Sequence, residues 1–593
     1  MTDQPDAPAP VPNPGLAPVG RKWFEILRSK SGLDNSQLSI REAQLFLLLA
    51  IIIGLFSGLL VVCFQISIEW VRITLLGSSL APSPLRAIFI PALGGLVVAF
   101  LVMKVFPRVR GSGVNQTKEA VYIYDGYIPF STVIGKFFLC ALAIGSGHSL
   151  GPEDPSLQIG AGVASALGRR LNLSRDKLRL LAPVGAAAGL AAAFNAPVSA
   201  VLFVIEEVIG RWNSGALGAV VLSAISGVVV ERGLMGSEPL FHIPVFNLAH
   251  TWELLAYAGL GIAGGLSSVV FVKLIAYLRP RLKALPRETQ YVQPAIAGLL
   301  IGVIALWLPQ VMGSGYHIID QVISEQYAWR ILVLLAAFKI LATTISFVSG
   351  TPGGMFAPTL FIGATVGGAV GAIERHFFPG LTGSIGSYAL VGMGTLFAGF
   401  LRAPLTSVFM VLEVSGDYSI IVPVMISNTI AYLISRHYLE TPIFDLLARE
   451  DGVDLPSMEE QREARSLSVE DAMRPAKGPI LEAEDSVTTA LDRIKESTDG
   501  VFLVRYKTGR WTNITGPVLR GLAGDAKGGL PLEEVYTSAI LPVVHPDQPL
   551  DFALRQMGAW PHLPVVSRAN PRKLEGVVSI EDILSCYKNA PRQ

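Results

Sequence analysis

Residues 155–160 read Pro-Ser-Leu-Gln-Ile-Gly, and residues 358–363, which lie 203 positions later, read Pro-Thr-Leu-Phe-Ile-Gly. The sequence on either side of this segment repeats in the same order. Gly-Ser-Gly at 111–113 returns at 313–315, and Ala-Pro at 196–197 returns at 403–404. Paired apolar segments that are interrupted by Gly and Pro at matching places indicate a substrate site near the bilayer midplane. The repeat therefore predicts a membrane protein that moves an ion.

The composition is that of an integral membrane protein. Hydrophobic residues make up 51% of the 593 and charged residues 16%, whereas a typical soluble chain has about 25% charged residues. Windows such as 45–64, 88–105 and 254–271 carry one charge or none, and about 20 apolar residues span a bilayer. Other apolar runs are shorter or are interrupted by glycine, which favours partial or tilted helices that are covered by protein. We therefore predict a packed, all-α polytopic membrane domain.

Changes in composition predict the domain boundaries. We expect a polar N-terminal segment at 1–40, a transmembrane domain at 41–450 and a charged linker at 451–466. The two copies within the transmembrane domain run from about 41 to 233 and from about 251 to 440. From residue 467 short β-like runs alternate with amphipathic helices, which is typical of an α+β module. This module divides into two βαββα units, at 467–525 and 530–590.

The distribution of basic residues predicts the orientation. Lys and Arg cluster near 108–110, 169–179 and 279–283, whereas 235–250 and 377–387 have none. By the positive-inside rule, the basic loops and both termini are cytoplasmic. Residues 1–20 lack the pattern of a signal peptide and are rich in Pro and Ala, so we expect them to be disordered. This N-terminal segment favours a bacterial plasma membrane.

Residue patterns argue against several functional classes. Outside the membrane-flanking clusters the sequence has no basic stripe, so we expect no nucleic-acid partner. The three cysteines, Cys63, Cys140 and Cys586, are far apart and form no Cys-x-x-Cys pair, which implies neither a disulfide framework nor a zinc site. The sequence shows no Ser/His/Asp order, metal cluster or phosphate-binding loop. We therefore expect neither an enzyme nor a required cofactor.

Two adjacent acids open the repeated segment in the first copy. Glu153 and Asp154 lie between apolar runs at 137–144 and 157–167, which places both carboxylates at a helix start within the membrane. Acids suit a helix N-terminus electrostatically, but a charge near the bilayer centre costs about 2.5–3.5 kcal/mol on insertion scales. A functional role is therefore the leading interpretation. In the alternative, both acids cap the helix at a water-exposed mouth; the two interpretations are compatible.

Two glycine-containing helix starts are candidates for binding an anion through backbone N–H groups. At 111–113 a serine hydroxyl and nearby amides can face an anion at a helix N-terminus, although a flexible turn has the same sequence pattern. At 353–358 two successive glycines allow close approach of a ligand, although a packed helix start needs none. The recurrence of such helix starts at matching places in both copies favours anion binding.

A further acid has no counterpart in the second copy. The helix expected at 198–209 ends with Glu206 and Glu207, and Glu206 matches Glu413 in the repeat. An unduplicated carboxylate such as Glu207 near a cytoplasmic helix end is a candidate proton acceptor. The alternative is a solvated terminal pair with Arg211.

These residues resemble the signatures of the CLC family of chloride channels and chloride/proton antiporters, which run GSGxP, GxEGP and GxFxP. The resemblance covers about 41–450. It implies the CLC fold, in which each protomer of a homodimer contains two inverted repeats and its own anion path. It also implies that Ser112 and Gly113 hold the central chloride, and that Glu153 is the gating glutamate, which competes with chloride and exchanges protons.

The resemblance implies roles for five more residues of the site. Gly354, Met355 and Phe356 correspond to residues whose amides line the anion site, and Lys136 corresponds to a buried lysine near the pore. Glu207 corresponds to the internal proton glutamate, which passive channels of the family generally lack. The resemblance thus favours a secondary active chloride/proton antiporter in a lipid membrane.

Three other functions compete with antiport. A passive voltage- or pH-gated chloride channel of the same fold is the main alternative. A nucleotide sensor whose membrane part serves as an anchor is a second. A fluoride-specific relative is disfavoured by the chloride-like Ser112.

The chain departs from the family signatures at four positions. Asn115 replaces a proline, Pro152 replaces the common arginine and Asp154 replaces a glycine, while Phe444 stands where a tyrosine is expected. Without that phenolic hydroxyl, we expect a different anion affinity or a different choice among anions. Like-charge repulsion from Asp154 favours the protonated form of Glu153, which shifts the expected pH dependence upward.

The C-terminal module resembles a tandem cystathionine-β-synthase (CBS) pair. Its second unit carries Gly576-x-x-Ser579-x-x-Asp582, which is similar to the family motif whose acid holds a nucleotide ribose, whereas the first unit has Thr, Thr and Val at 512, 515 and 518. This implies at most one site for ATP, ADP or AMP, formed by Ser579 and Asp582. The alternative is a structural dimerisation module without a ligand.

Overall fold

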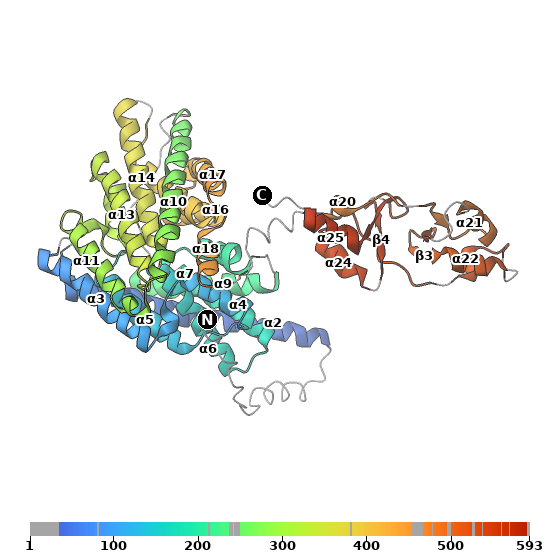
Figure 1. The fold of residues 1–593 in the computed structure, drawn as a ribbon, viewed down its shortest axis with the longest axis horizontal. Helices are drawn as coiled ribbons and strands as arrows, with labels where there is room; N and C mark the ends of the chain where they lie inside the picture. Colours follow the sequence, from blue (N-terminus) through green and yellow to red (C-terminus); the bar gives the residue numbers. More distant parts are fainter. Residues whose placement is uncertain are drawn as a thin grey trace. The chain divides into compact units, whose positions relative to one another are not determined.

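The structure is a computed structural model of the 593-residue chain. It describes residues 35–79, 82–210, 214–236, 241, 250–379, 382–453, 455, 467–476, 478–494, 500–524, 528–536, 538–558, 560–568 and 570–589. Most of the segments predicted at 1–40 and 451–466, together with Arg211, lie outside the described residues. The chain divides into two compact units, Met1–Leu455 and Pro456–Gln593 (Figure 1).

The first unit is helical, and its helices form two series that correspond one to one. The first series is α2 (Asn35–Leu76), α3 (Pro84–Lys104), α4 (Gly113–Tyr122), α5 (Phe130–Gly145), α6 (Glu153–Arg170), α7 (Arg175–Phe194), α8 (Pro197–Phe203) with the π-helical η2 (Val204–Ile209), and α9 (Ser214–Met235). The second series is α10 (Glu253–Lys283), α11 (Gln293–Ala305), α12 (Tyr316–Ile323), α13 (Trp329–Val348), α14 (Phe356–Phe377), α15 (Ile385–Leu401), α16 (Pro404–Ser415) and α17 (Ile421–Tyr438). A last helix, α18 (Ile443–Glu450), follows.

The helix lengths agree with the mixture expected from the sequence. Among the described residues, eight helices are long and apolar enough to cross a membrane. Four more apolar helices, α5, α11, α15 and α16, are shorter. The prediction of an all-α polytopic domain is confirmed.

Equivalent helices of the two series pack in equivalent ways. In the first series α6 packs on α7 and α2 on α9, and in the second series α14 packs on α15 and α10 on α17. In Figure 1, α10, α13 and α14 lie side by side. A Cβ on Gly160 would lie 2.1 Å from the carbonyl oxygen of Gly185, and a Cβ on Gly363 would lie 2.3 Å from that of Gly392. These glycines therefore allow the close helix approach that small residues provide in membranes.

The duplicated glutamates hold the two copies together. Glu206 accepts hydrogen bonds from the Thr406 amide (2.9 Å) and hydroxyl (2.6 Å) at the start of α16. Glu413 accepts from the amides of Val198 (2.8 Å) and Ser199 (2.7 Å) at the start of α8. Each acid thus caps the broken helix of the opposite copy, where the unpaired N–H groups favour a negative charge. This reciprocal capping gives the Glu206/Glu413 pair a structural role.

The second unit is an α+β module. Strands β1 (Leu481–Glu482), β2 (Val501–Arg505) and β3 (Trp511–Thr515) form one sheet, in which β1 is parallel and β3 antiparallel to β2. Strands β4 (His562–Val566) and β5 (Leu574–Ser579) form an antiparallel pair. The helices are α20 (Val469–Ala472), α21 (Val487–Arg493), α22 (Gly516–Leu522), α23 (Leu532–Val535), α24 (Leu550–Met557) and α25 (Ile580–Asn589).

The two hydrophobic cores of this module exchange short helices. Val469 of α20 packs in the core that contains Leu563 and Ile583 from β4 and α25. Leu532 of α23 packs in the core that contains Leu481 and Phe502 from β1 and β2. Each unit is therefore completed by a helix from the other, and the contiguous boundaries predicted at 467–525 and 530–590 do not describe this exchange.

Candidate functional site

The loops that precede α6 and α14 meet inside the membrane unit. Gly151 and Gly354 exchange two backbone hydrogen bonds, with N–O distances of 2.7 and 2.8 Å. The repeated helix starts predicted from the sequence therefore lie together, one from each copy. Because the first N–H groups of each helix lack intrahelical partners, such a junction favours negative charge.

The Glu153 carboxylate occupies this junction. Its Oε2 accepts a hydrogen bond from the amide of Ala357 in the first turn of α14, at 3.2 Å, and its Oε1 accepts from the hydroxyl of Tyr316 at the start of α12. A Cβ on Gly151 would lie 2.3 Å from Oε2, so glycine there leaves room for the carboxylate. Glu153 is fully buried and Asp154 is 1% exposed. The alternative in which both acids cap a water-exposed mouth is therefore wrong.

Asp154 caps α4 instead of its own helix. Its Oδ1 accepts from the Val114 amide at 2.7 Å, and its Oδ2 accepts from the Ser112 hydroxyl at 3.1 Å. A Cβ on Gly113 would lie 2.8 Å from Oδ1, so this glycine admits the carboxylate. The two residues predicted to hold an anion on α4, Ser112 and Gly113, thus contact an internal carboxylate.

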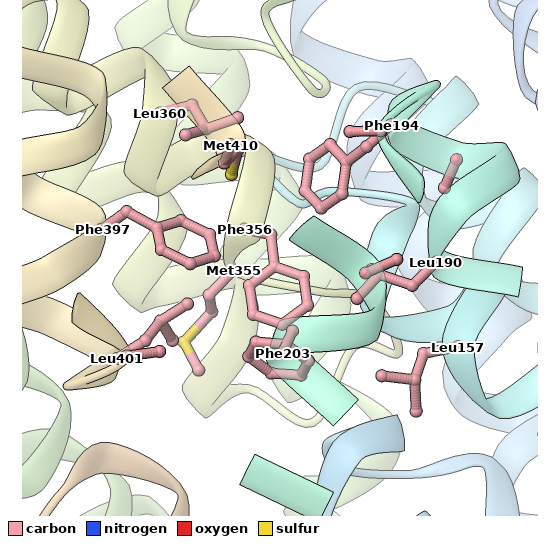
Figure 2. Packing of buried hydrophobic residues seen from close by; sticks show 14 of the residues in the cluster. Leu157, Leu190, Phe194, Phe203, Met355, Phe356, Leu360, Phe397, Leu401 and Met410 are labelled. Carbon is pink, nitrogen blue, oxygen red and sulfur yellow. The ribbon is translucent and has the colours of Figure 1, made fainter. Parts of the chain in front are cut away.

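Aromatic rings from several helices gather at the start of α14. The Phe356 ring lies 5.1 Å from Phe203, 6.2 Å from Phe194 and 6.2 Å from Phe444, between ring centroids. Figure 2 shows Phe356 between Phe203 and Phe194, with Met355 beside it. The structure therefore brings together Met355, Phe356 and Phe444, which were predicted from distant parts of the chain.

Asn115 links α18 to this cluster. Its side-chain amide donates to the carbonyl oxygen of Phe444 at 2.8 Å. Asn115, which replaces the proline of the first signature, therefore anchors Phe444, which replaces the expected tyrosine.

Ser112 also borders a cavity of about 310 Å³ that carries basic side chains. Arg110, Arg279 and Lys283 line it. Arg279 binds Glu450 (2.7 Å) and Asp451 (2.8 Å) at the end of α18. The remaining lining residues are Gly111, Asn115, Gln116, Glu119, Phe347, Val348, Gly350, Thr351 and Asp451. The acids Glu119 and Asp451 also line the cavity, and Arg279 and Lys283 are both paired with Asp451, so the cavity carries mixed charge.

A pair of buried lysines supports the two Gly-Ser-Gly turns. Lys136 donates to the carbonyl oxygen of Gly111 at 2.8 Å. Lys339, which lies 203 positions later, donates to those of Gly313 (2.8 Å) and Val311 (3.0 Å). Lys136 was predicted from the sequence and Lys339 was not, although Lys339 is the sole charge in the apolar run at 331–348.

Glu207 lies in a buried ionic cluster. Its Oε1 lies 2.9 Å from the Lys118 ammonium, which also lies 3.2 Å from Asp445. Glu207 is 5% exposed, so it does not belong to a solvated pair; its proposed partner Arg211 lies outside the described residues. Lys118 and Asp445 were not predicted from the sequence. Both are charged residues close to motif positions in the sequence: Lys118 lies six residues after Ser112, and Asp445 directly follows Phe444.

Ser579 and Asp582 lie together at the start of α25. The Ser579 hydroxyl donates to Asp582 Oδ2 at 2.7 Å, and Arg474 lies 2.5 Å from Oδ1. In the first unit, the hydroxyl of Thr512 donates to the carbonyl oxygen of Ala539 at 3.0 Å. Among the described residues, no group of three His, Cys, Asp or Glu side chains forms a metal site.

Two family models match the chain. The model described as "Voltage gated chloride channel" matches residues 94–436, and the CBS domain model matches residues 532–589. The first covers more than half of the chain and contains the repeated helix starts. The second covers the unit that carries Ser579 and Asp582.

Several curated and solved proteins are similar to this chain. The H(+)/Cl(-) exchange transporters ClcA of Vibrio campbellii and Vibrio vulnificus are each 33% identical over 416 and 419 residues, which is 68% of this chain and 88% of each relative. The crystal structure of a slow cyanobacterial Cl-/H+ antiporter has 26% identity and a TM-score of 0.63 over 68% of this chain and 97% of its own.

A further solved structure supports the fold alone. It is a eukaryotic CLC transporter that covers 91% of this chain and 97% of its own, with 22% identity and a TM-score of 0.59. The inverted-repeat fold and the match to the membrane domain agree with the eight candidate spans. This multi-pass membrane chain therefore belongs to the voltage gated chloride channel family, the CLC family, and carries a C-terminal CBS domain.

Proposed function

We propose that this chain is a secondary active antiporter that exchanges chloride for protons. One observation carries the proposal: the Glu153 carboxylate accepts a hydrogen bond from the Ala357 amide at the start of α14. An anionic side chain thus fills a position that a helix N-terminus offers to a free anion. The relatives in Vibrio, which are named H(+)/Cl(-) exchange transporters, support the same function.

Competition between this side chain and chloride couples the two ions. The ionised Glu153 binds the Ala357 amide of α14 and repels an approaching anion, whereas the protonated side chain binds that amide more weakly. Chloride then takes the position, and its presence in turn favours the protonated, displaced side chain. Two ligands that compete in this way have linked occupancies. Phe356, the first residue of α14, lies next to Ala357, and Ser112 borders the cavity of mixed charge.

The internal proton is assigned to Glu207. It is buried beside Lys118 and far in sequence from Glu153, so it provides a second carboxylate for a proton path. A passive chloride channel is the alternative, and it agrees with the description of the matching family as a voltage gated chloride channel.

Flux in sealed vesicles distinguishes the two functions. Under an imposed chloride gradient with no initial proton gradient, an antiporter drives protons uphill, whereas a channel moves chloride alone. Chloride flux without proton movement would leave the channel as the function.

Three features of the assembly follow from the same assignment. We assign a homodimer with one anion path in each protomer, a bacterial plasma membrane and cytoplasmic termini. Exposed apolar side chains on α16 and α17, such as Phe409 (39%) and Val422 (49%), are compatible with contact to lipid or a second copy. Crosslinking in native membranes tests the dimer.

We also assign an adenine-nucleotide site to the second CBS unit, with Asp582 as the ribose ligand. The Asp582 carboxylate is held by Ser579 and Arg474. To bind the ribose, one of its oxygens has to leave the Arg474 guanidinium, which could then bind a phosphate group of the nucleotide. Calorimetric titration of the purified chain with ATP, ADP and AMP tests this site. Deletion of 467–593 distinguishes a transporter from a nucleotide sensor that is anchored by its membrane part. A transporter keeps its basal flux without the module, whereas a sensor loses its activity.

A further inference from the structure

A carboxyl group of the chain itself fills the start of α4. Asp154 accepts hydrogen bonds from the Ser112 hydroxyl at 3.1 Å and from the Val114 amide at 2.7 Å. Asp154 is 1% exposed and Ser112 is 5% exposed, so both donors point into protein. The proposed function uses Glu153 at the start of α14 and leaves Asp154 without a role.

Two glycines make room for the Asp154 side chain. A Cβ on Gly113 would lie 2.8 Å from Asp154 Oδ1, and a Cβ on Gly354 would lie 2.6 Å from the Asp154 Cβ. Real Cβ atoms essentially never make contacts under 3.0 Å, so a larger residue at either position would push Asp154 aside. Both glycines were predicted to line an anion site. The space that they leave open is filled by Asp154.

The turn that presents the two α4 donors has supports of its own. Lys136 donates to the carbonyl oxygen of Gly111 at 2.8 Å, and Gln116 donates to that of Arg110 at 2.6 Å. These bonds do not involve Asp154. We therefore expect the Ser112 hydroxyl and the Val114 amide to keep their directions when the carboxyl group is removed.

The corresponding helix start in the second copy carries no such side chain. Ala357, which lies 203 positions after Asp154, has a methyl group in its place, and its amide binds Glu153 at 3.2 Å. The α14 donor is therefore held by the residue that exchanges with chloride, whereas the α4 donors are held by a second acid. Ser112 also lines the cavity of mixed charge, so Asp154 takes the donors that a halide from this cavity would meet at α4.

We propose that Asp154 occupies the anion position at the start of α4, so that each protomer binds one transported chloride, at the start of α14, and none at Ser112. Asp154 is thus a specificity-determining residue that sets how many halides the path holds. The argument depends on the occupied donors and holds for either charge state of Asp154. The inference rests on the proposed chloride transport, and it departs from the role that the family resemblance implies for Ser112.

Removal of the side chain supplies the main test. Asp154→Gly introduces the residue that is usual in the family signature and frees the Ser112 hydroxyl and the Val114 amide for a halide. At saturating chloride, the wild-type protein should bind about one ion per protomer and Asp154→Gly about two, because a second helix start then has free donors. Equilibrium dialysis of the purified full chain with radioactive chloride counts the ions. Anomalous diffraction from bromide-soaked crystals locates them, with the added peak expected beside Ser112.

Two further variants separate occupancy from a general loosening of the site. Asp154→Asn keeps an oxygen at the same reach and should retain the wild-type number of ions. Ser112→Ala should leave the chloride affinity unchanged within about twofold in the wild-type background but lower the affinity of the added ion by about tenfold or more in the Asp154→Gly background. A dependence of this kind between two contacting residues is what a double-mutant cycle measures.

Three results would overturn the proposal: a bromide peak beside Ser112 in the wild-type protein, equal ion numbers in wild type and Asp154→Gly, or an added ion in Asp154→Asn. If Asp154→Gly cannot be purified as a folded protein, Ser112→Ala decides. An unchanged chloride affinity then supports the proposal, and a tenfold loss refutes it. Failure of the proposed function is recognised separately, because the wild-type protein would then carry chloride without driving protons, whatever the number of bound ions.

Discussion

Asp154 reaches from the second residue of α6 to the start of α4, where its Oδ1 accepts a hydrogen bond from the Val114 amide at 2.7 Å. The same carboxylate accepts from the Ser112 hydroxyl. An acid of the chain therefore uses the Ser112 hydroxyl and the Val114 amide, two donors that the start of α4 offers to an anion. Glu153, the preceding residue, binds α14 on the other side of the junction. The two neighbouring acids thus each hold one broken helix start, and bound chloride has to share this region with both.

The first prediction concerns the charge of Asp154. Asp154→Asn keeps an oxygen that can accept from Val114 but removes the negative charge, so chloride should bind more tightly. We expect a gain of roughly tenfold, since about 1.4 kcal/mol corresponds to a factor of ten. Calorimetric titration of the purified protein with chloride measures it. Asp154→Glu, which retains the charge, is the control. Equal affinities for wild type and Asp154→Asn would show that this carboxylate does not oppose chloride.

The second prediction concerns the hydroxyl of Tyr316. Tyr316→Phe removes the hydrogen bond to Glu153 while it keeps the ring, and hydrogen bonds to charged groups contribute about 1.5–3 kcal/mol. The carboxylate should therefore leave the α14 amides more readily, and chloride turnover should rise severalfold while proton coupling persists. Rates of chloride efflux from proteoliposomes provide the measurement. A turnover equal to or below that of the wild-type protein would argue that this bond does not hold the gate closed.

The third prediction separates the capping glutamates from the neighbouring acid. Glu413→Gln removes the charge that caps α8, and loss of a capping interaction costs about 0.5–2 kcal/mol. The variant should unfold at a lower temperature and still couple protons to chloride. Glu207→Gln should strongly reduce proton flux, and loss of its buried ion pair with Lys118 should also lower the unfolding temperature. Thermal unfolding in detergent, recorded beside the two fluxes, checks both variants. If Glu413→Gln lost proton coupling and Glu207→Gln kept it, the assignment of capping to Glu413 and of proton transfer to Glu207 would be wrong.

Much of the site could be predicted from the repeat, because short stretches of sequence are enough to identify the broken helix starts. Gly and Pro residues mark the broken helix starts, and the duplicated register shows which starts correspond. The structure brings Gly151 and Gly354 into contact, as the prediction of a shared midplane site requires. The reciprocal bonds of Glu206 and Glu413 explain why these acids recur in both copies. Sequence comparison alone revealed the recurrence without its cause.

The side-chain partners could not be predicted because they depend on how distant helices pack. Lys118 meets Asp445 across 327 positions, and Tyr316 meets Glu153 across 163. The alternative interpretation made Asp154 a cap of its own helix, whereas its side chain crosses to α4. In the C-terminal module, the exchange of α20 and α23 between the two cores likewise follows from tertiary packing, which contiguous sequence patterns do not encode.

The most direct test of the central claim is the simultaneous measurement of chloride and proton flux for wild type and Glu153→Gln in sealed liposomes. The glutamine has nearly the shape of the glutamate but cannot exchange a proton with solution. The wild-type protein should drive protons uphill under a chloride gradient, and Glu153→Gln should carry chloride with no coupled proton movement. Undiminished proton coupling in Glu153→Gln would contradict the account.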